Sequence, residues 1–208
     1  MMAESDGAVT NTSRRAQSPS NESQALAWFV ELQRGDAGVR ARLRRARSRV
    51  DVLMEPKAIQ LAQRVGRLSK VSRASDEEIG EALDLARVLA HVKMHDGERR
   101  VMQQAGWQTF VGDRRESDAG KDAPALSGIR FRRLLTTDAG EPLVAAFVRL
   151  VRQLDGTVNV HELSWDFLNW SHPLHGARVR SKWAFDYFAA GTPASIALNT
   201  STHDEGNS

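Results

Sequence analysis

The sequence predicts an all-α protein made of two small helical bundles that a flexible linker joins. Apolar residues recur at the three- and four-residue spacing of helices, and the strict alternation typical of strands is almost absent. Residues that start helices stand before several of these stretches, namely Asp36, Pro56, Ser75 and Pro142. Periodicity and start signals therefore agree on helices.

Four helices are expected in the first half, at about 21–33, 37–50, 56–68 and 75–95. The second has a narrow apolar stripe made of Val39, Leu43, Ala46 and Val50. The fourth opens on a capping box at Ser75 and Glu78, and its core stripe includes Ile79. We expect these helices to form one bundle over residues 21–111.

Residues 112–125 contain Gly and Pro and few apolar side chains, which is typical of a flexible linker. Four further helices follow at about 127–136, 142–154, 160–171 and 177–190. They predict a second bundle over residues 126–190, whose core is supplied by Trp170, Trp183, Tyr187 and Phe188. The polar ends, 1–20 and 191–208, are predicted to be disordered.

The composition narrows the class of protein. There is no cysteine, which excludes disulfides and thiolate metal sites. No stretch reaches the roughly 18–20 apolar residues that span a bilayer, and residues 1–20 lack the apolar segment of a secretory signal. These observations predict a cytoplasmic protein without a membrane partner.

The net charge of +3 hides an uneven distribution of charge along the chain. Residues 34–73 carry twelve Lys and Arg against three acidic residues, whereas residues 74–126 carry seven against eleven. Arg accounts for 24 of the 29 basic residues, and its guanidinium suits bidentate phosphate contacts and stacking on bases. The asymmetry predicts a surface that faces a polyanion.

The helix expected at 37–50 carries its arginines in two rows beside the apolar stripe. A helical wheel places Arg40, Arg44 and Arg47 on one flank and Arg42, Arg45 and Arg49 on the other. Arg34 lies just before this helix. We expect one row to serve the fold or a partner subunit and the other to face nucleic acid. A solvated basic face with salt bridges between helices is the alternative.

Smaller basic clusters follow in the second half, on three of its expected helices. The full set of candidate nucleic-acid-binding residues is Arg34, Arg40, Arg42, Arg44, Arg45, Arg47, Arg130, Arg132, Arg133, Arg149, Arg152, Arg178, Arg180 and Lys182. Each cluster alone is weak evidence for nucleic-acid binding, because helices commonly carry such charges. Together they predict a basic surface that includes both halves of the chain.

Several of these segments resemble one known family in the same order along the chain. The segments are Trp-Phe-Val-Glu-Leu at 28–32, the arginine-rich run at 40–46 after Gly35, Phe-Arg-Arg-Leu-Leu at 131–135, Leu-Val-Arg-Gln-Leu at 150–154, Leu-Asn-Trp at 168–170 and the run at 179–188. In this order the chain is similar, over about residues 24–190, to the small subunit of the type I-E CRISPR Cascade complex, the CasB family.

The resemblance implies an all-helical, non-catalytic subunit that is present in two copies in a ribonucleoprotein. It implies contacts with the backbone subunits, the large subunit and a second copy of the chain, in a complex assembled on guide RNA. Basic surfaces would hold the target or displaced DNA strand in the R-loop. The matching basic residues are Arg40, Arg42, Arg44, Arg45, Arg132, Arg133, Arg152, Arg180 and Lys182. Residues 56–125 match less distinctly.

General physics agrees with such a role. A protein that holds a strand whose sequence is read by base pairing elsewhere should grip phosphates and ignore bases. Nearby aromatic side chains add stacking in proteins that bind single strands. Trp107 and Phe110 are candidates for stacking, although aromatic residues at such positions more often belong to the core.

No pattern in the sequence indicates catalysis, and no cofactor is expected. Phosphate-binding loops, dinucleotide fingerprints and nucleophile elbows are absent. His91 and His95 have the four-residue spacing of metal ligands on a helix, but no third ligand accompanies them. Asp166 and Asp186 are interpreted as salt-bridge partners for the many arginines.

Two other interpretations stay open. A helix-turn-helix regulator would use residues 37–50 as its recognition helix, with Gly35 or Gly66 near the turn. That helix carries almost no Asn, Gln or Ser to contact base edges, which counts against a regulator. The second alternative is a scaffold whose arginines meet acidic protein surfaces only.

Overall fold

Our computed structural model describes residues 21–66, 75–106 and 124–189 of the chain. Within these ranges it contains ten helices and two strands of two residues each, so the predicted all-α class is confirmed. None of the helices in the described ranges has both the length and the apolar character needed to cross a bilayer. The predicted tails, most of the predicted linker, and Trp107 and Phe110 lie outside the described residues.

The first half contains α1 (Asn21–Arg34), α2 (Ala37–Arg45), α3 (Arg49–Leu53), α4 (Pro56–Gly66), α5 (Asp76–Ala90), β1 (Met94–His95) and α6 (Val101–Ala105). Three predicted helix starts are confirmed. The Asp36 carboxylate accepts a hydrogen bond from the backbone of Gly38 at 2.7 Å, Pro56 is the first residue of α4, and Ser75 forms the capping box of α5.

The second half contains α7 (Gly128–Leu135), α8 (Glu141–Gln153), β2 (Thr157–Val158), α9 (Val160–Leu168) and α10 (Gly176–Ala189). All four predicted helices of this half are present. Strands β1 and β2 pair in parallel, with Met94 opposite Thr157. This short pairing fixes the end of the first half against the connection between α8 and α9.

The single helix predicted at 37–50 is wrong, because the chain forms two helices there. Ala46 leaves the helical region at ψ 126°, and Ser48 then caps α3 by accepting a hydrogen bond from the backbone of Asp51. Asp51 in turn accepts from the backbone of Ser48, which completes a capping box. The break turns Val50 outward, so its side chain is 68% exposed and does not belong to the predicted apolar stripe.

The helix predicted at 75–95 is also too long. It ends at Ala90, and the chain then extends to pair β1 with β2 before forming the unpredicted helix α6. Ile79, expected in the core stripe, is 37% exposed, while the later residues of that stripe are buried. The interior of the protein therefore meets only the later turns of α5.

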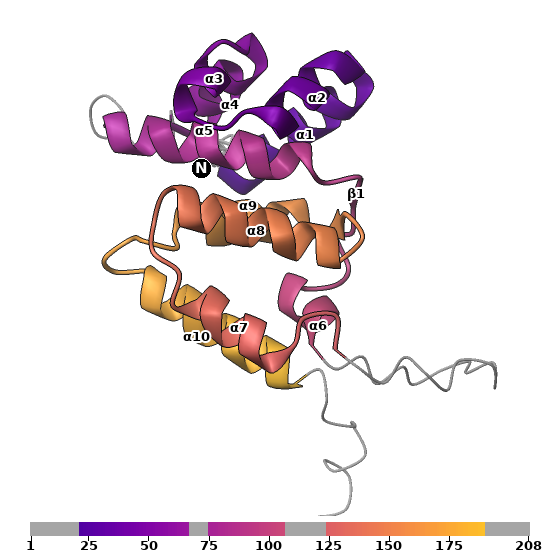
Figure 1. Cartoon of the computed structure of the whole chain (residues 1–208), viewed down its shortest axis with the longest axis vertical. Helices are drawn as coiled ribbons and strands as arrows, with labels where there is room; N and C mark the ends of the chain where they lie inside the picture. The colour runs from indigo at the N-terminus through magenta and orange to yellow at the C-terminus, as the bar shows by residue number, and fades with distance from the viewer. Residues whose placement is uncertain (1–20, 67–74, 107–123, 190–208) are drawn as a thin grey trace, which may run out of the picture.

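The helices are stacked along the long axis of the molecule (Figure 1). Helices α2, α3 and α4 lie at one end, α5 and then α8 and α9 lie across the middle, and α7, α10 and α6 lie at the other end. Helix α6 precedes residue 107 in sequence but packs against α10. Helices from the two halves of the sequence thus contact one another.

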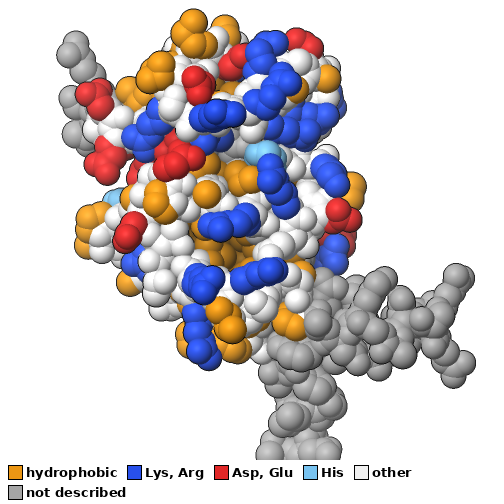
Figure 2. All heavy atoms as spheres, in the orientation of Figure 1, with side chains coloured by type: hydrophobic (Ala, Val, Ile, Leu, Met, Phe, Trp, Pro, Cys, Tyr) orange, Lys and Arg blue, Asp and Glu red, His pale blue; other side chains and the backbone are white. Residues whose placement is uncertain are grey.

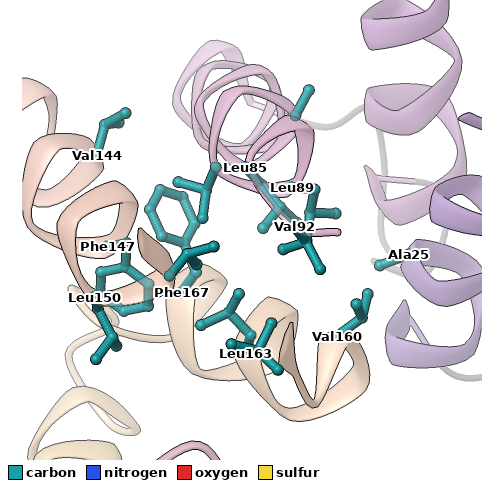
Figure 3. Close-up of a cluster of buried hydrophobic side chains, with 14 of the residues drawn as sticks. Ala25, Leu85, Leu89, Val92, Val144, Phe147, Leu150, Val160, Leu163 and Phe167 are labelled. Carbon is teal, nitrogen blue, oxygen red and sulfur yellow. The ribbon is translucent and has the colours of Figure 1, made fainter. Parts of the chain in front are cut away.

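The buried side chains form one cluster that includes both halves (Figure 3). At its centre Ala25 of α1 and Leu89 of α5 face Val160 and Leu163 of α9, with Phe147 of α8 beside them. The division into two bundles stays a prediction. The buried cluster joins helices from both sides of the predicted boundary. Of the aromatic residues expected in the second core, Trp170, Trp183 and Tyr187 are buried, whereas Phe188 is 66% exposed at the end of α10.

Candidate nucleic-acid interface

One flank of the arginine-rich segment is engaged with carboxylates of the fold. Arg42 forms a bidentate ion pair with Glu55, whose side chain is almost fully buried, and the Nη2–Oε2 distance is 3.2 Å. Arg49 pairs with Asp84 of α5. Arg45 is exposed and has no ion pair in the described parts of the chain. Two of the three arginines on this flank therefore attach α2 and α3 to the rest of the protein.

The other flank lies against the C-terminal end of α5 and has no carboxylate partner among the described residues. Arg44 Nε donates a hydrogen bond of 2.5 Å to the carbonyl of Ala90, and Arg40 donates to the side chain of Gln33. Gln33 itself donates to the carbonyl of Val92 at 2.9 Å. The Arg44 contact satisfies a carbonyl that the end of α5 leaves without a helical partner, and positive charge is favourable there. Arg44 retains a guanidinium charge that no acid of the described residues neutralises.

His91, at the end of α5, lies in a positive environment made by both halves of the chain. Burial lowers its pKa to about 4, and the charges of Arg152, Arg44 and Arg87 act in the same direction. Burial, then the charges of Arg40 and Arg152, also lower the pKa of Arg44. His91 is therefore neutral at pH 7. Arg44 and Arg152 lie near it, and Arg40 adds a third like charge beside Arg44.

A groove between α7 and α8 continues this positive surface. It measures about 350 Å³, and its lining includes Arg130 and Arg133 of α7 and Arg149 of α8. Arg149 Nε donates to the carbonyl of Ala145 on its own helix at 3.1 Å, which fixes its direction. None of these three arginines forms an ion pair in the part of the chain that the structure describes. Within the described ranges, the groove thus combines three cations that no acid neutralises.

We call these six residues, Arg40, Arg44, Arg152, Arg149, Arg130 and Arg133, the arginine band. Arg152 joins the cluster on α2 to the groove, because it lies three residues after Arg149 on α8. Figure 2 shows basic side chains running down this face from α2 over α8 to α7, with apolar surface exposed between them. Like charges placed together without acids from the described residues repel one another, which destabilises the free protein.

The remaining candidates lie outside the arginine band. Arg34, Arg47, Arg132 and Arg178 are exposed. Arg180 donates to the carbonyl of Trp170 at 2.9 Å, and its guanidinium lies 5.8 Å from the centre of that indole ring. It helps to pack α10 against the end of α9. Whether any candidate contacts nucleic acid stays a prediction.

Lys182 belongs to a partly buried ion cluster of α9 and α10. Its ammonium group contacts Glu162 and lies 3.2 Å from Asp166, which also accepts a hydrogen bond from the Trp183 indole. Burial raises the pKa of Asp166 to about 6, although the Lys182 charge opposes the shift. Asp186 pairs with Arg100 at 2.9 Å. The prediction of an arginine partner is thus confirmed for Asp186 and wrong for Asp166, whose partner is Lys182.

The histidine pair singled out by its spacing does not share a helix face. Helix α5 ends before His91, and His95 lies in β1, where its Nδ1 accepts a hydrogen bond from the backbone of Val160 at 3.1 Å. No group of three His, Cys, Asp or Glu side chains in the described ranges is arranged to hold a metal ion.

Sequence reasoning missed the role of His91 and the acids that neutralise the arginines. Glu55 lies between α3 and α4, and Asp84 lies on α5, so helical spacing within α2 and α3 gives no sign of these pairs. Glu141 similarly reaches across from α8 to Arg87 of α5, at 2.8 Å between Oε1 and Nη2. The only sequence signal is the presence of acidic residues on otherwise apolar helix faces.

The family model of the CRISPR-associated protein Cse2 matches residues 39–188. The chain belongs to this family. The match covers most of the chain, and it confirms the resemblance to the type I-E Cascade small subunit, because Cse2 and CasB name the same family. Neither the curated proteins nor the solved structures give a match.

Membership of the family establishes the general role of the protein. Cse2 proteins are structural subunits of the CRISPR Cascade complex, so this chain acts in a complex with other Cascade proteins. The matched region includes α2, α7 and α8, and with them the whole arginine band.

Proposed function

We propose that this Cse2 subunit uses the arginine band to hold the displaced or target DNA strand while the R-loop is open, without reading its sequence and without catalysis. The observation that carries the proposal is the set of six arginines without ion pairs in the described ranges that follow one another on one face, from α2 over α8 to α7 (Figure 2). By contrast, Arg42, Arg49 and Arg87 pair with acids of the fold. Guanidinium groups bind phosphates through charge-assisted hydrogen bonds.

Weak contacts with the DNA backbone are sufficient to stabilise an open R-loop. The RNA–DNA duplex that forms in an R-loop is about as stable as the DNA duplex that it replaces, so contacts to the backbone of one strand tip the balance. The salt dependence of such contacts comes from the release of counterions, and it is independent of sequence. Bases are read by the guide RNA, which leaves the protein no need for base-specific side chains.

Both ends of the molecule expose apolar side chains that suit protein partners. Val50, Leu53 and Met54 are exposed at the end formed by α3. Ile129 and Phe185 are exposed at the opposite end, on α7 and α10. We infer that these ends contact the backbone subunits, the large subunit or a second copy of the chain, since exposed apolar clusters mark interaction surfaces. The face that carries the arginine band lies between them and stays available to DNA (Figure 2).

The proposal is tested by measuring binding of the full chain to unrelated single- and double-stranded DNA over a series of salt concentrations. We expect weak binding that falls steeply with salt and changes little between sequences. A strong preference for one palindromic duplex would support a helix-turn-helix regulator instead. No binding at low salt would support a scaffold that meets acidic protein surfaces.

A further inference from the structure

We propose that the groove between α7 and α8 seats one unpaired base of the strand that the arginine band holds. The inference rests on the proposed function, because it requires single-stranded DNA on this face. It goes further in giving the protein a contact with bases as well as with phosphates. The base would lie on the apolar floor, and its flanking phosphates would lie at the arginine rim.

The floor of the groove suits a flat apolar surface. It is lined by Leu126, Leu134, Ala146 and Leu150, and the first two and the last of these are almost fully buried. Ala146, 9% exposed, is the smallest of them and leaves the groove room between the two helices. The volume of about 350 Å³ lies at the small end of the range for ligand sites, which fits one base rather than several.

The rim supplies charge on both sides of this floor. Arg130 and Arg133 come from α7 and Arg149 comes from α8, so guanidinium groups approach from two directions. A guanidinium binds phosphate through its edge and stacks on a base through its face. Three such groups around one apolar floor therefore match a nucleotide in both of its parts.

The polar group at the rim is compatible with any base. Gln153, at the end of α8, lines the groove, and its amide forms no hydrogen bond within the described ranges. An amide both donates and accepts, so it can pair with an edge of each of the four bases. Thr137, the other uncharged polar residue that lines the groove, already donates from its hydroxyl to the carbonyl of Arg133 at 2.8 Å. The groove thus has no fixed pattern that selects one base.

An acidic peptide with an apolar side chain would also complement such a groove, but the surroundings favour nucleic acid. The groove lies at one end of the arginine band, which continues through Arg152 to Arg44 and Arg40. A ligand that carries a negative charge on every repeating unit can follow this path along its whole length. Single-stranded DNA has that property, and proteins that bind it commonly combine a basic track with stacking sites.

The test compares two single-stranded oligomers of equal length, one of deoxythymidine and one with an abasic deoxyribose–phosphate backbone. Both carry the same phosphates, so only the bases differ. We expect the full chain to bind the base-bearing oligomer more tightly, by about threefold to tenfold, because a base gains contact with the apolar floor and with the face of a guanidinium group. This comparison needs no variant. Equal affinity for the two oligomers overturns the inference.

A matched pair of variants assigns any preference to the groove. Ala146→Met fills the floor and keeps every arginine, whereas Ala145→Met adds the same side chain at the neighbouring exposed position, which does not line the groove. We expect Ala146→Met to reduce the ratio of the two affinities toward one and to leave binding of the abasic oligomer unchanged. Ala145→Met should keep the wild-type ratio. Thermal unfolding and circular dichroism show whether both variants are folded.

The outcomes separate this inference from the proposed function. If the wild-type chain binds both oligomers equally and in a salt-dependent manner, phosphate binding is supported and the base site is contradicted. An acidic peptide would then be the better candidate ligand of the groove. The same follows if Ala146→Met retains the preference for bases. If the chain binds neither oligomer, the proposed function fails, and the base site fails with it.

Discussion

Arg49 holds the buried carboxylate of Asp84 through two hydrogen bonds to one oxygen, at 2.9 Å from Nε and 2.7 Å from Nη2. The pair joins α3 to α5 across the surface of Gly80, where a Cβ atom would approach Nη1 of Arg49 to 2.3 Å. Asp84 also lies 3.7 Å from Arg87. An arginine from the most basic stretch of the chain thus serves the fold, which separates it from the arginine band.

Arg49→Gln should lower the free energy of unfolding without a matching loss of DNA binding. The substitution leaves the Asp84 carboxylate buried with only the more distant Arg87, and a buried polar group that loses its partner costs about 1–3 kcal/mol. Urea unfolding measures this loss. Arg45→Gln is the matched control, because Arg45 is exposed and has no ion pair in the described parts of the chain, and should change stability by less than about 0.5 kcal/mol. Equal effects of the two variants would contradict the structural role of Arg49.

Replacing both Arg149 and Arg152 by Gln should weaken DNA binding and leave the fold intact. The two side chains are exposed on α8 and form no ion pairs in the described ranges, so their loss removes phosphate contacts only. On single-stranded DNA, the slope of log affinity against log salt should become less steep by about 0.7 for each lost phosphate contact. Replacing Arg44 and Arg45 by Glu would test DNA binding less cleanly, because the Arg44→Glu change would place a carboxylate against the carbonyl of Ala90.

The control for this variant removes the same charge away from the arginine band. Arg34→Gln combined with Arg178→Gln also removes two exposed arginines, at the end of α1 and on α10. Its affinity and salt slope should stay closer to those of the wild-type chain. If the two double variants lose affinity equally, DNA senses only the net charge, and the band has no special role.

Glu81→Gln should remove part of the pH dependence of stability. Burial, with the neighbouring charge of Glu77, raises the pKa of Glu81 from 4.5 to about 7. Between these values the folded protein binds a proton that the unfolded chain has released, so the free energy of unfolding falls as pH rises through this window. The amide has no charge to bury, and the variant should be more stable than the wild-type chain above pH 7. Unfolding curves at mildly acidic and mildly alkaline pH test this, and an unchanged pH dependence would contradict it.

Gly176→Ala should destabilise the start of α10. A Cβ atom there would lie 2.4 Å from the backbone oxygen of Trp170, so the turn before the helix must shift, and such overpacking costs about 1–3 kcal/mol. Gly128→Ala, at the start of α7, is the matched control, because a Cβ atom meets nothing within 4 Å. It should be neutral or stabilise the protein by up to about 1 kcal/mol. Thermal unfolding of the two variants in parallel would show no difference if the close contact at Gly176 is unimportant.

Local signals predicted where most helices begin, because a helix start depends on a few neighbouring residues. Asp36, Pro56 and Ser75 act as their positions suggest. Helix ends depended more on tertiary structure. Helix α5 stops where the chain turns to pair β1 with β2, whose residues lie more than sixty positions away. The break before α3 had a local signal, the capping box of Ser48 and Asp51, but the surrounding arginines favour helix and hid it.

The candidate site was predicted in outline only. Spacing separated the arginines of the basic segment into two rows, but the carboxylates that engage Arg42 and Arg49 come from outside the helices of these arginines. Similarly, the position of Arg152 near His91 and Arg44 depends on the packing of α8 against α5. Periodicity describes one helix at a time, and a surface shared by three helices requires their arrangement in space.

The most direct test of the central claim is the lifetime of the R-loop formed by an assembled Cascade complex that contains this subunit. The complex would carry either the wild-type chain or the chain with Arg133, Arg149 and Arg152 replaced by Gln. Assembly is checked by the subunit composition of the purified complex. We predict normal assembly and a shorter R-loop lifetime, with a larger difference at low salt than at high salt. An unchanged lifetime in a correctly assembled complex would contradict the claim that the arginine band holds DNA.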